Sequence, residues 1–459
     1  MDRRCFLKTL TAGALTSAAP AILRGTPQPP NIVFILADDL GYGDLSCYGS
    51  RIATPNLDQM AKDGAMFRHF SVASPVCSPS RAGILTGRYP VRVGVPGVFT
   101  PQDTTGMNLG ETTIAQMLKP AGYKTSCVGK WHLGSLPKYL PTNRGFDEYF
   151  GMPCSNDQDP TLLLNNCDIV EQKANLVTLT QRYTDRAVDF IQRSKNSPFF
   201  LYMGHWAPHP PLVASKAFRC KSHLGLYGDV VQEMDASVGR VLQALKDNGV
   251  DGNTLVMFTS DNGPWFQGSA GNLRGRKGDT WEGGMREPFI ARMPGVIPAG
   301  QDLDAFASAL DILPTVASLA GVATPPNLDG VDISTMLTGA VPQVDRPPFL
   351  YLDSWNLQCV RVGQWKLHLS RYNCPAWSPT PAGGRFNLRL VNPELYDVFD
   401  DPSEGEDCAG DNPDLVAQMQ QQVADMLPSF PAEVQNAWAD TQSRPVYPNA
   451  SGALPVPIT

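Results

Sequence analysis

The sequence predicts an α/β fold, in which a large mixed, mostly parallel sheet lies between layers of helices and a smaller α+β domain follows. Strand-like apolar runs alternate with helical stretches through residues 31–319, which is the pattern of a parallel sheet. The composition changes near residues 340–348, and beyond them short strand-like runs follow one another. With 459 residues, 42% of them hydrophobic, the chain is globular and long enough for one large and one small domain.

The first predicted elements lie between residues 31 and 122. Residues 31–36 form a continuous apolar run rich in β-branched side chains, which is typical of a central strand covered on both faces. A helix is expected over 55–62, because Thr54 can cap it and Pro55 suits its first position. A second helix is expected over 112–118, ended by the Pro120 and Gly122 that follow.

The alternation continues to residue 319. Strands are predicted over 124–128, 199–203 and 254–259, and helices over 183–194, 226–248 and 303–319. The helix over 226–248 is amphipathic and is followed by Gly249, a common residue after a helix end. The helix over 303–319 is expected to kink at the Asp311–Pro314 segment.

The C-terminal part is predicted to be an α+β domain with antiparallel strands. Strand-like runs lie at 349–352, 359–362, 365–369 and 394–398, and a stretch rich in Pro, Gly and Asn interrupts them at 373–387. The tail from Ser443 is rich in proline and is expected to be irregular. We therefore divide the chain into a main domain at 31–345 and a C-terminal domain at 346–459.

The first 24 residues are interpreted as an export signal. Arg3 and Arg4 precede Phe6-Leu7-Lys8 and a mildly apolar run, which is typical of a twin-arginine signal peptide. An anchoring helix is the alternative, but the run is short and contains Gly13 and Pro20. We expect transport by the twin-arginine translocase, a periplasmic or secreted bacterial protein, and no stable membrane span in the mature form.

Charge and cysteine content restrict the partners. Removal of the signal leaves a net charge of about −10, so the mature chain is a poor partner for nucleic acid. An anionic substrate would need its counter-charge concentrated in one pocket. The ten Cys are scattered without a Cys-x-x-Cys pair, which argues against a zinc cluster, and any disulfide connectivity stays open.

Acidic residues follow two of the predicted strands. Asp38 and Asp39 come after the first strand, and Asp261 and Asn262 come after the strand over 254–259. The carboxyl ends of strands are where open α/β sheets bind ligands, and an oxygen-only set of this kind suits Ca²⁺ or Mg²⁺ better than zinc. The alternative is that these residues only form turns, in which Asp is common.

Two motifs carry a resemblance to a known family. Cys77-Ser78-Pro79-Ser80-Arg81, followed by Leu85-Thr86-Gly87, matches the first signature of the sulfatases, and Gly122-Tyr123-Lys124-Thr125 with Gly129-Lys130-Trp131-His132 matches the second. The chain from Asn31 to about Asp401 resembles this family, and it looks most similar to the arylsulfatase A and N-acetylgalactosamine-6-sulfatase branch. The resemblance implies the alkaline-phosphatase-like fold and places a catalytic sulfatase domain at 31–345.

The resemblance also implies a cofactor and a modified residue. In this family the Cys at position 77 is oxidised to Cα-formylglycine (3-oxoalanine) by a formylglycine-generating enzyme. One hydroxyl of the hydrated aldehyde attacks sulfur, and the other then expels sulfate. Asp38, Asp39, Cys77, Asp261 and Asn262 would form the shell of one Ca²⁺ ion. The alternative for Cys77 is a structural thiol near a helix N-terminus.

Six further residues match functional positions of the family. Arg81 would steady the formylglycine hydrate and the metal carboxylates, with a helix-surface arginine as the alternative. Lys130 would bind sulfate, and His132 would accept the proton of the second hydroxyl. The spacing favours His209 over His205 as a sulfate-binding residue. Lys277 would contact sulfate and help to protonate the leaving oxygen, and Ser155 would be a further sulfate contact.

The predicted function is that of an exported sulfatase, a sulfuric ester hydrolase that acts on aryl sulfates or on the terminal O-sulfate of a glycan. One alternative is a phosphate or phosphonate monoester hydrolase of the same superfamily. Another is a non-catalytic binder of sulfated glycans, if Cys77 stays unmodified. The loops at 91–108, 153–175 and 371–388 are expected to line the substrate pocket. Four aromatic residues could stack on sugars, although aromatics are more often core: Trp265, Phe266, Trp355 and Trp377.

Overall fold

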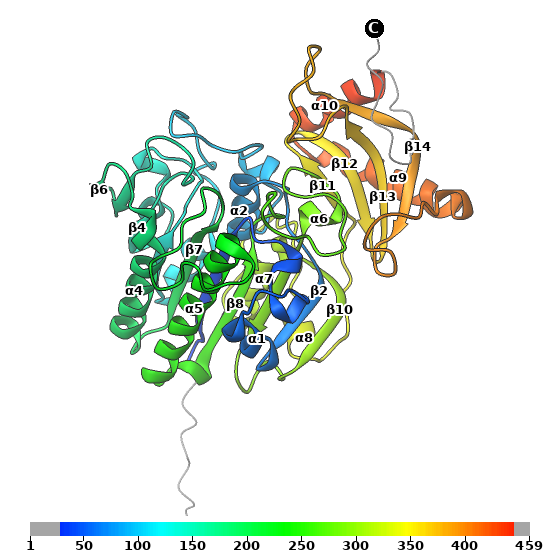
Figure 1. Cartoon of the computed structure of the whole chain (residues 1–459). Coiled ribbons are helices and arrows are strands. Elements are labelled where there is room, and N and C mark those ends of the chain that lie inside the picture. The colour runs from blue at the N-terminus through cyan, green and yellow to red at the C-terminus, as the bar shows by residue number, and fades with distance from the viewer. Residues whose placement is uncertain (1–27, 445–459) are drawn as a thin grey trace, which may run out of the picture.

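The computed structural model describes residues 28–444, so the predicted signal peptide at 1–24 and nearly all of the predicted irregular tail lie outside the described residues. A ten-stranded sheet forms the centre of the molecule (Figure 1). Its strands, in order across the sheet, are β10 (Gln301–Ser308), β2 (Ala65–Ser71), β9 (Arg286–Arg292), β8 (Thr254–Ser260), β1 (Asn31–Asp38), β7 (Phe199–Pro208), β3 (Lys124–Gly129), β4 (Glu148–Gly151), β5 (Leu163–Asn165) and β6 (Asp168–Glu171).

The middle of this sheet is parallel. Strands β8, β1, β7, β3 and β4 pair in parallel, with Phe34 opposite Met257 on one side and Tyr202 on the other. β9 runs against both of its neighbours, and β5 and β6 extend the other edge in antiparallel pairing. Every residue of β1 is buried, as its continuous apolar sequence predicts for a central strand. The predicted large, mostly parallel sheet is confirmed.

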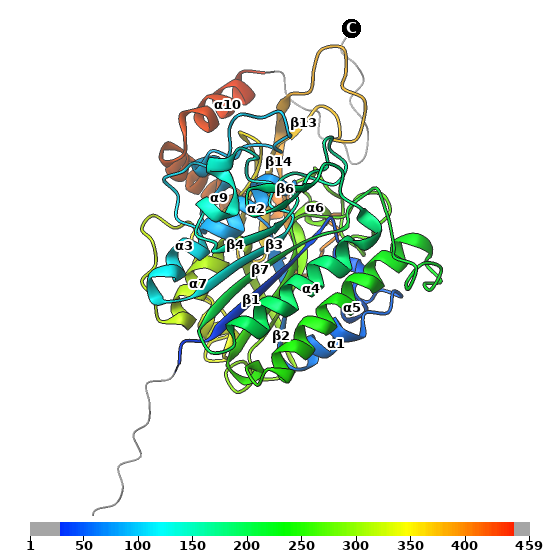
Figure 2. The same ribbon diagram turned by 90° about the vertical axis from the view of Figure 1, so that its left-hand side faces the viewer.

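Helices cover both faces of the sheet (Figure 2). One layer contains α1 (Pro55–Lys62), α4 (Leu176–Ser194) and α5 (Gly225–Asp247); the other contains α2 (Cys77–Thr86), α3 (Ile114–Leu118), α7 (Ile312–Ala320) and α8 (Ser334–Leu337). Alternate residues of β1 belong to different cores, because side chains of a strand alternate between the faces: Val33 and Ile35 pack towards the first layer, and Phe34 and Leu36 towards the second.

The predicted helix over 303–319 is wrong in its first part. Residues 301–308 form β10, which pairs in parallel with β2 at the edge of the sheet, and the α-helix begins only at Ile312. The N-terminal half of β10 alternates between exposed and half-buried residues, as an edge strand with one solvated face does. The Ala and Leu residues of this segment are compatible with a helix as well as with a strand, so pairing with β2 determines its conformation.

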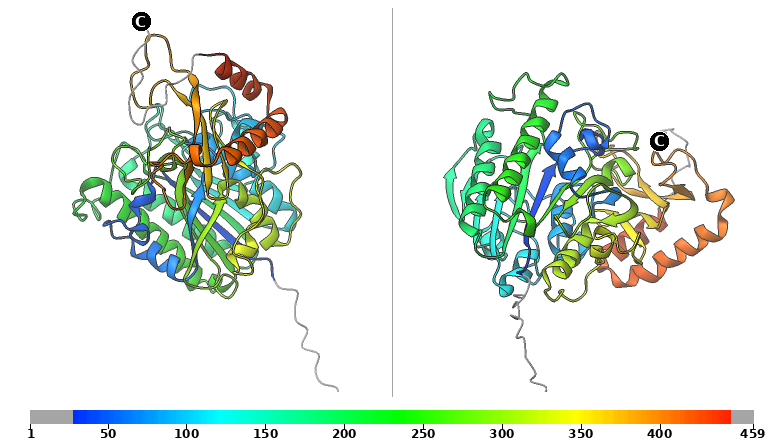
Figure 3. Two further views of the ribbon diagram at one scale, coloured as in Figure 1. Left: turned by 90° about the vertical axis from the view of Figure 1, so that its right-hand side faces the viewer. Right: turned by 90° about the horizontal axis from the view of Figure 1, so that it is seen from below.

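The C-terminal part contains a four-stranded antiparallel sheet with two helices packed on it (Figure 3). Its elements are β11 (Phe349–Asp353), β12 (Asn356–Val362), β13 (Trp365–Tyr372), β14 (Asn387–Asp397), α9 (Pro413–Met426) and α10 (Ala432–Ser443). Lys366, on β13, donates to the Glu282 carboxylate at 2.9 Å, and Glu282 begins the short helix α6 (Glu282–Met285) that precedes β9. A buried ion pair therefore joins the small sheet to the large one.

Two sequence expectations concern cysteines and membranes. The nine Cys between residues 28 and 444 are free thiols. Within the same range no helix is long and apolar enough to cross a bilayer.

Candidate active site

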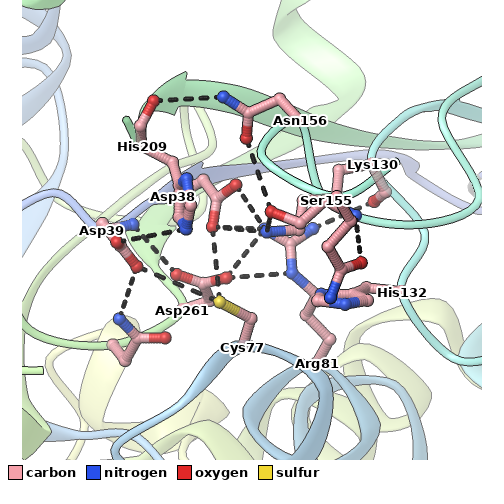
Figure 4. Close-up of polar contacts among 12 residues, drawn as sticks. Asp38, Asp39, Cys77, Arg81, Lys130, His132, Ser155, Asn156, His209 and Asp261 are labelled. Carbon is pink, nitrogen blue, oxygen red and sulfur yellow. Dashed lines mark hydrogen bonds and ion pairs between the residues drawn. The ribbon is translucent and has the colours of Figure 1, made fainter. Parts of the chain in front are cut away.

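The predicted site residues converge at the carboxyl ends of adjacent parallel strands (Figure 4). Asp38 is the last residue of β1, Asp261 follows β8, Lys130 follows β3 and His209 follows β7. Cys77, the first residue of α2, points into the same space, with its Sγ 3.7 Å from the Asp38 Oδ1. The structure thus brings together the acidic residues and the motif cysteine.

Four of these residues form a compact set of possible metal ligands. One ligand atom each from Asp38, Asp39, Cys77 and Asp261 lies within 4.8 Å of the other three, and all four residues are buried. Asn262 adds an amide: its Nδ2 donates to Asp39 Oδ1 at 2.8 Å, while its buried Oδ1 has no hydrogen-bond partner among the described residues. Hard oxygen ligands of this kind fit a divalent cation such as Ca²⁺ or Mg²⁺.

Arg81 contacts two of these carboxylates, those of Asp38 and Asp261. It lies four residues after Cys77, so the two side chains share one face of α2. Its guanidinium donates from Nε to Asp261 Oδ2 at 2.9 Å and from Nη1 to the Lys130 carbonyl at 2.9 Å, and it lies 3.4 Å from Asp38. Burial lowers the pKa of Arg81, but the carboxylates of Asp261 and Asp38 outweigh this effect and raise it. Since the side chain is fully buried, the helix-surface alternative is wrong.

Two lysines reach the same carboxylates. Lys130 Nζ lies 2.7 Å from Asp38 Oδ2 and 3.0 Å from the Ser155 hydroxyl, and Lys277 Nζ lies 2.8 Å from Asp39. Burial alone would lower the pKa of both lysines, but Asp38 and Asp39 respectively raise it, so both amines are charged. Three carboxylates therefore face three cationic side chains, Arg81 included, and the described side chains are close to neutral together.

The tautomer of His132 follows from its partner. Its Nε2 lies 2.8 Å from the Phe99 carbonyl oxygen, which can only accept, so Nε2 carries the hydrogen. The buried Nδ1 has no hydrogen-bond partner within residues 28–444 and presents a lone pair. Burial, reinforced by the positive charges of Lys130 and Arg81, holds the pKa of His132 well below its usual range. His132 is therefore a neutral imidazole with one free proton acceptor.

His209 is the histidine that faces the carboxylates. Its Nδ1 contacts the Pro210 carbonyl, and its Nε2 lies 3.5 Å from Asp39 Oδ2. His205 instead lies in the core, with its Nε2 3.4 Å from the Ser237 hydroxyl of α5. The spacing argument that prefers His209 agrees with this geometry.

Glycines let the chain pass tightly beneath Lys130. A Cβ on Gly129 would lie 1.8 Å from the Gly204 carbonyl oxygen, and one on Gly151 would lie 1.8 Å from the Gly129 oxygen. Gly129 also has φ +107°, a conformation that side chains oppose. The close approach allows the Lys130 N–H to donate to the Gly204 oxygen at 2.8 Å, which fixes where the lysine leaves the sheet.

Sequence reasoning did not single out two residues that support the site. Asn156 donates from Nδ2 to the His209 carbonyl at 3.2 Å. Gln158 donates to the Phe99 carbonyl oxygen, which also accepts the hydrogen bond from His132. Gln158 further accepts the Ser155 N–H at 3.1 Å. Both lie in the 151–158 stretch that resembles the family, but nothing in their spacing assigns them a partner.

Comparison with known proteins decides the family. Residues 30–322 match the family model described as Sulfatase. The chain belongs to the sulfatase family. The N-acetylgalactosamine-6-sulfatase of Rattus norvegicus is 44% identical to this sulfatase over 389 residues, which cover 77% of this chain and 74% of that protein. Arylsulfatase A of Homo sapiens is 38% identical over 458 residues, which cover 89% and 90% of the two chains.

Solved structures agree with these relatives. The crystal structure of Ps i-CgsB in complex with k-i-k-neocarrahexaose has a TM-score of 0.77 and 30% sequence identity to this sulfatase, and the alignment covers 91% of this chain and 98% of that one. The predicted family, the branch resemblance and the alkaline-phosphatase-like fold are confirmed. This sulfatase is a sulfuric ester hydrolase.

Proposed function

We propose that this sulfatase hydrolyses aryl or sugar O-sulfate monoesters with a Cα-formylglycine at position 77 and one bound Ca²⁺ ion. The observation that carries the proposal is the buried set of Asp38, Asp39, Asp261 and Cys77 with the ligand atoms inside 4.8 Å. Magnesium would satisfy the same oxygen atoms, but a ligand set built from several protein carboxylates is more typical of calcium.

The residues present fit the cation. Asp38, Asp39, Asp261, Asn262 and the modified residue 77 would hold it, and the Oδ1 of Asn262 is an acceptor that the described part of the chain leaves unused. A bound divalent cation supplies Lewis-acid stabilisation of negative charge on a sulfate oxygen. Because the described side chains balance three negative against three positive charges, the cation would make the site net positive and suited to a monoanionic ester.

Two lysines, a histidine and a serine bind and orient the sulfate. Lys130 and His209 approach it from the ends of β3 and β7, the Ser155 hydroxyl adds a hydrogen-bond donor beside Lys130, and Lys277 approaches from the loop before α6. The Lys277 ammonium can give a proton to the oxygen that leaves with the alcohol. Arg81 holds the carboxylates and the backbone of Lys130 in place, so these groups do not need to reorganise during the reaction.

Residue 77 supplies the nucleophile. A hydrated formylglycine carries two hydroxyls on one carbon, one to attack sulfur and one to expel sulfate afterwards. His132 then has a clear task, because its free Nδ1 can accept the proton of the second hydroxyl while Nε2–H stays bound to the Phe99 carbonyl. A non-catalytic sulfated-glycan binder would need neither a modified residue 77 nor this proton acceptor.

The substrate class and location complete the proposal. Similar proteins named N-acetylgalactosamine-6-sulfatase and arylsulfatase A favour a terminal sugar sulfate or an aryl sulfate. The Arg3-Arg4 pair favours export by the twin-arginine translocase to the periplasm or the medium of a bacterium. A phosphatase with two zinc ions and several histidine ligands is disfavoured, because of the described histidines only His209 joins a possible ligand group here.

Mass spectrometry of the peptide containing residue 77 tests the proposal. After co-expression with a formylglycine-generating enzyme, we expect loss of the thiol, gain of the aldehyde or its hydrate, and a rise in aryl sulfatase activity. Cys77→Ala should be inactive, whereas Cys127→Ala, which removes another buried thiol on β3, should keep the activity. Chelation should abolish turnover, and Ca²⁺ should restore it better than Zn²⁺. An active preparation whose Cys77 is an unmodified thiol would contradict the mechanism.

A further inference from the structure

A polar cavity of about 610 Å³ lies beside the candidate active site. One wall is the loop of residues 268–281 between β8 and α6, and the other is formed by β12, β13 and the segment up to residue 385 of the small sheet. Figure 1 shows α6, which follows this loop, next to the four-stranded sheet. Residues of the predicted loop at 371–388 therefore line this cavity, and the loop of residues 268–281 lines its other side.

The cavity is cationic in an acidic protein. Four arginines line it, Arg274, Arg276, Arg371 and Arg385, against the single carboxylate of Asp279; we call it the arginine cavity. Burial raises the pKa of Asp279 to about 7, so at neutral pH even this carboxylate balances the arginines incompletely. Since the whole chain carries a formal net charge of −7, this concentration of positive charge is local.

Two of the four arginines form no ion pair with a carboxylate of the described residues. Arg371 pairs with Glu394, and Arg385 lies 3.4 Å from Asp353. Arg274 only donates to the backbone carbonyl of Glu404, and among residues 28–444 no ion pair is formed by Arg274 or Arg276.

Aromatic rings hold these two guanidinium groups by their faces. The Cζ of Arg274 lies 3.8 Å from the ring centroid of Trp281, and that of Arg276 lies 4.3 Å from the ring centroid of Phe266. Stacking uses the face of the planar guanidinium and leaves N–H groups on its edge for a bidentate oxyanion.

The cavity and the sulfate site share one loop of the chain. Arg276, Lys277 and Gly278 are consecutive: the outer two line the cavity, while Lys277 reaches Asp39 at 2.8 Å. The Gly278 N–H donates to the Pro75 carbonyl at 2.9 Å, two residues before Cys77. Because Lys277 is the proposed proton donor to the leaving oxygen, we expect the alcohol side of a substrate to extend from Lys277 towards the arginines.

The rim offers a surface for a sugar ring. Phe266 and Trp377 meet edge to face with ring centroids 6.1 Å apart, and both are at least one-third exposed. Of the four predicted stacking residues, Trp355 instead packs against the core, and Trp265 lies edge-on against Phe266. An exposed aromatic pair beside unpaired arginines is a surface that suits a sugar ring with an anionic substituent.

From these contacts we infer that the arginine cavity binds a second anionic group, the carboxylate or sulfate of the sugar next to the one whose sulfate is cleaved. This inference rests on the proposed sulfatase function of the adjacent site and names its substrate class as acidic oligosaccharides. Arg274 and Arg276 recognise the oxyanion, and Phe266 and Trp377 contact the ring that carries it.

Matched substrates test this inference with the matured enzyme. The probes are p-nitrophenyl sulfate and two pairs of oligosaccharides with a terminal N-acetylgalactosamine 6-sulfate. In the first pair the second sugar is a uronic acid or the same sugar with its carboxylate reduced to the alcohol. In the second pair it is a neutral sugar with or without a sulfate. We expect the wild type to prefer the anionic member of at least one pair by about tenfold in kcat/KM, the range of a charge-assisted hydrogen bond. The two pairs separate a carboxylate from a sulfate.

Variants assign the preference to the cavity. Arg274→Gln and Arg276→Gln should each lower the anionic-to-neutral ratio of kcat/KM by about tenfold, and Arg276→Lys should recover part of it, since it keeps the charge without the planar edge. Arg240→Gln, a surface arginine on α5 that pairs with Asp185, should leave the ratio unchanged. A purely structural role would slow all substrates alike and leave the ratio intact.

Failure of the inference and failure of the proposed function look different. Wild type that hydrolyses p-nitrophenyl sulfate but shows no preference within either pair would overturn the acidic subsite alone. The same holds if the preference survives in both glutamine variants. Matured wild type that hydrolyses no sulfate ester at all would instead reject the proposed function, and the subsite with it.

Discussion

The ion pair between Asp261 and Arg81 gives a quantitative test of how the site is held together. Asp261 accepts the Arg81 Nε–H at 2.9 Å, lies 2.7 Å from its Nη2, and accepts the Asp39 N–H at 3.1 Å. Asp261→Asn keeps the size of the side chain and removes its charge. Leaving one member of a fully buried ion pair without its partner costs about 3–5 kcal/mol. Because Asp38 remains 3.4 Å from Arg81, we expect the lower end, about 3 kcal/mol.

Urea unfolding in the presence of a chelator measures this cost, and Asp44→Asn provides the matched control. Asp44 is a buried carboxylate that accepts from Gly41, Tyr227 and Ser269 but has no cationic partner in the part of the chain that the structure describes, and burial raises its pKa to about 6. Because burial already disfavours the charge of Asp44, its replacement should lower the free energy of unfolding by only about 1.5 kcal/mol, the lower end for a hydrogen bond to a charged group.

Added Ca²⁺ supplies the second readout. At a concentration of about 100 Kd a ligand that binds only the folded state raises the free energy of unfolding by about 2.7 kcal/mol. Wild type and Asp44→Asn should both show this gain, and Asp261→Asn should lose most of it because a ligand carboxylate is gone. Equal destabilisation by the two substitutions, or a full calcium gain in Asp261→Asn, would refute the reasoning.

Three further outcomes are expected. Lys277→Ala should slow alkyl sulfates more than p-nitrophenyl sulfate, because poor leaving groups need a proton most, and equal slowing in steady-state assays would remove this role from Lys277. The matured enzyme should hydrolyse an aryl sulfate at least about a hundredfold more efficiently in kcat/KM than the matching aryl phosphate, a barrier difference of about 2.7 kcal/mol; comparable phosphate turnover would favour the phosphatase alternative. Burial lowers the pKa of His205 to about 4. Below about pH 6.5 the His205 imidazole is therefore protonated in the unfolded chain, whereas in the folded chain it stays neutral down to about pH 4. The free energy of unfolding consequently falls as the pH drops from about 6.5 towards 4. Between pH 7.5 and 5, wild type should lose about 2 kcal/mol more than His205→Asn in urea unfolding, and parallel losses would show that His205 does not titrate in this way.

The central strands and the location of the site could be predicted because two independent signals agree. A buried parallel strand needs a continuous apolar run, as in residues 31–36, and its carboxyl end is where polar residues gather. β2 and β9 carry no such signal: β9 contains Pro288 and the buried Glu287, whose carboxylate oxygens have no hydrogen-bond partner in the described part of the chain. Their strand conformation depends on pairing with neighbours distant in sequence.

The candidate site was predictable only where a motif named its chemistry. Nothing in the spacing of residues 77–81 reveals an oxidised cysteine, so this assignment rests on the resemblance to sulfatases. Lys130 and His132 do not continue the extended strand before them, because β3 ends at Gly129 and His132 has φ +63°. Both side chains still reach the site because the chain turns there. The arginine cavity was invisible in the sequence, since its four arginines span residues 274–385 and meet only through the packing of two sheets.

The closely packed glycines near Lys130 tolerate substitution far less than the residues that border the arginine cavity. Since a methyl group at Gly129 or Gly151 would overlap a backbone oxygen, selection from a randomised library should return glycine at these two positions. Residues 266, 274, 276 and 377 meet no comparable restriction, because their side chains border open space. Duplicated copies of such a gene could therefore acquire new substrate ranges by substitution at the rim while the chemistry of sulfate transfer stays the same. Engineering of this scaffold should follow the same division.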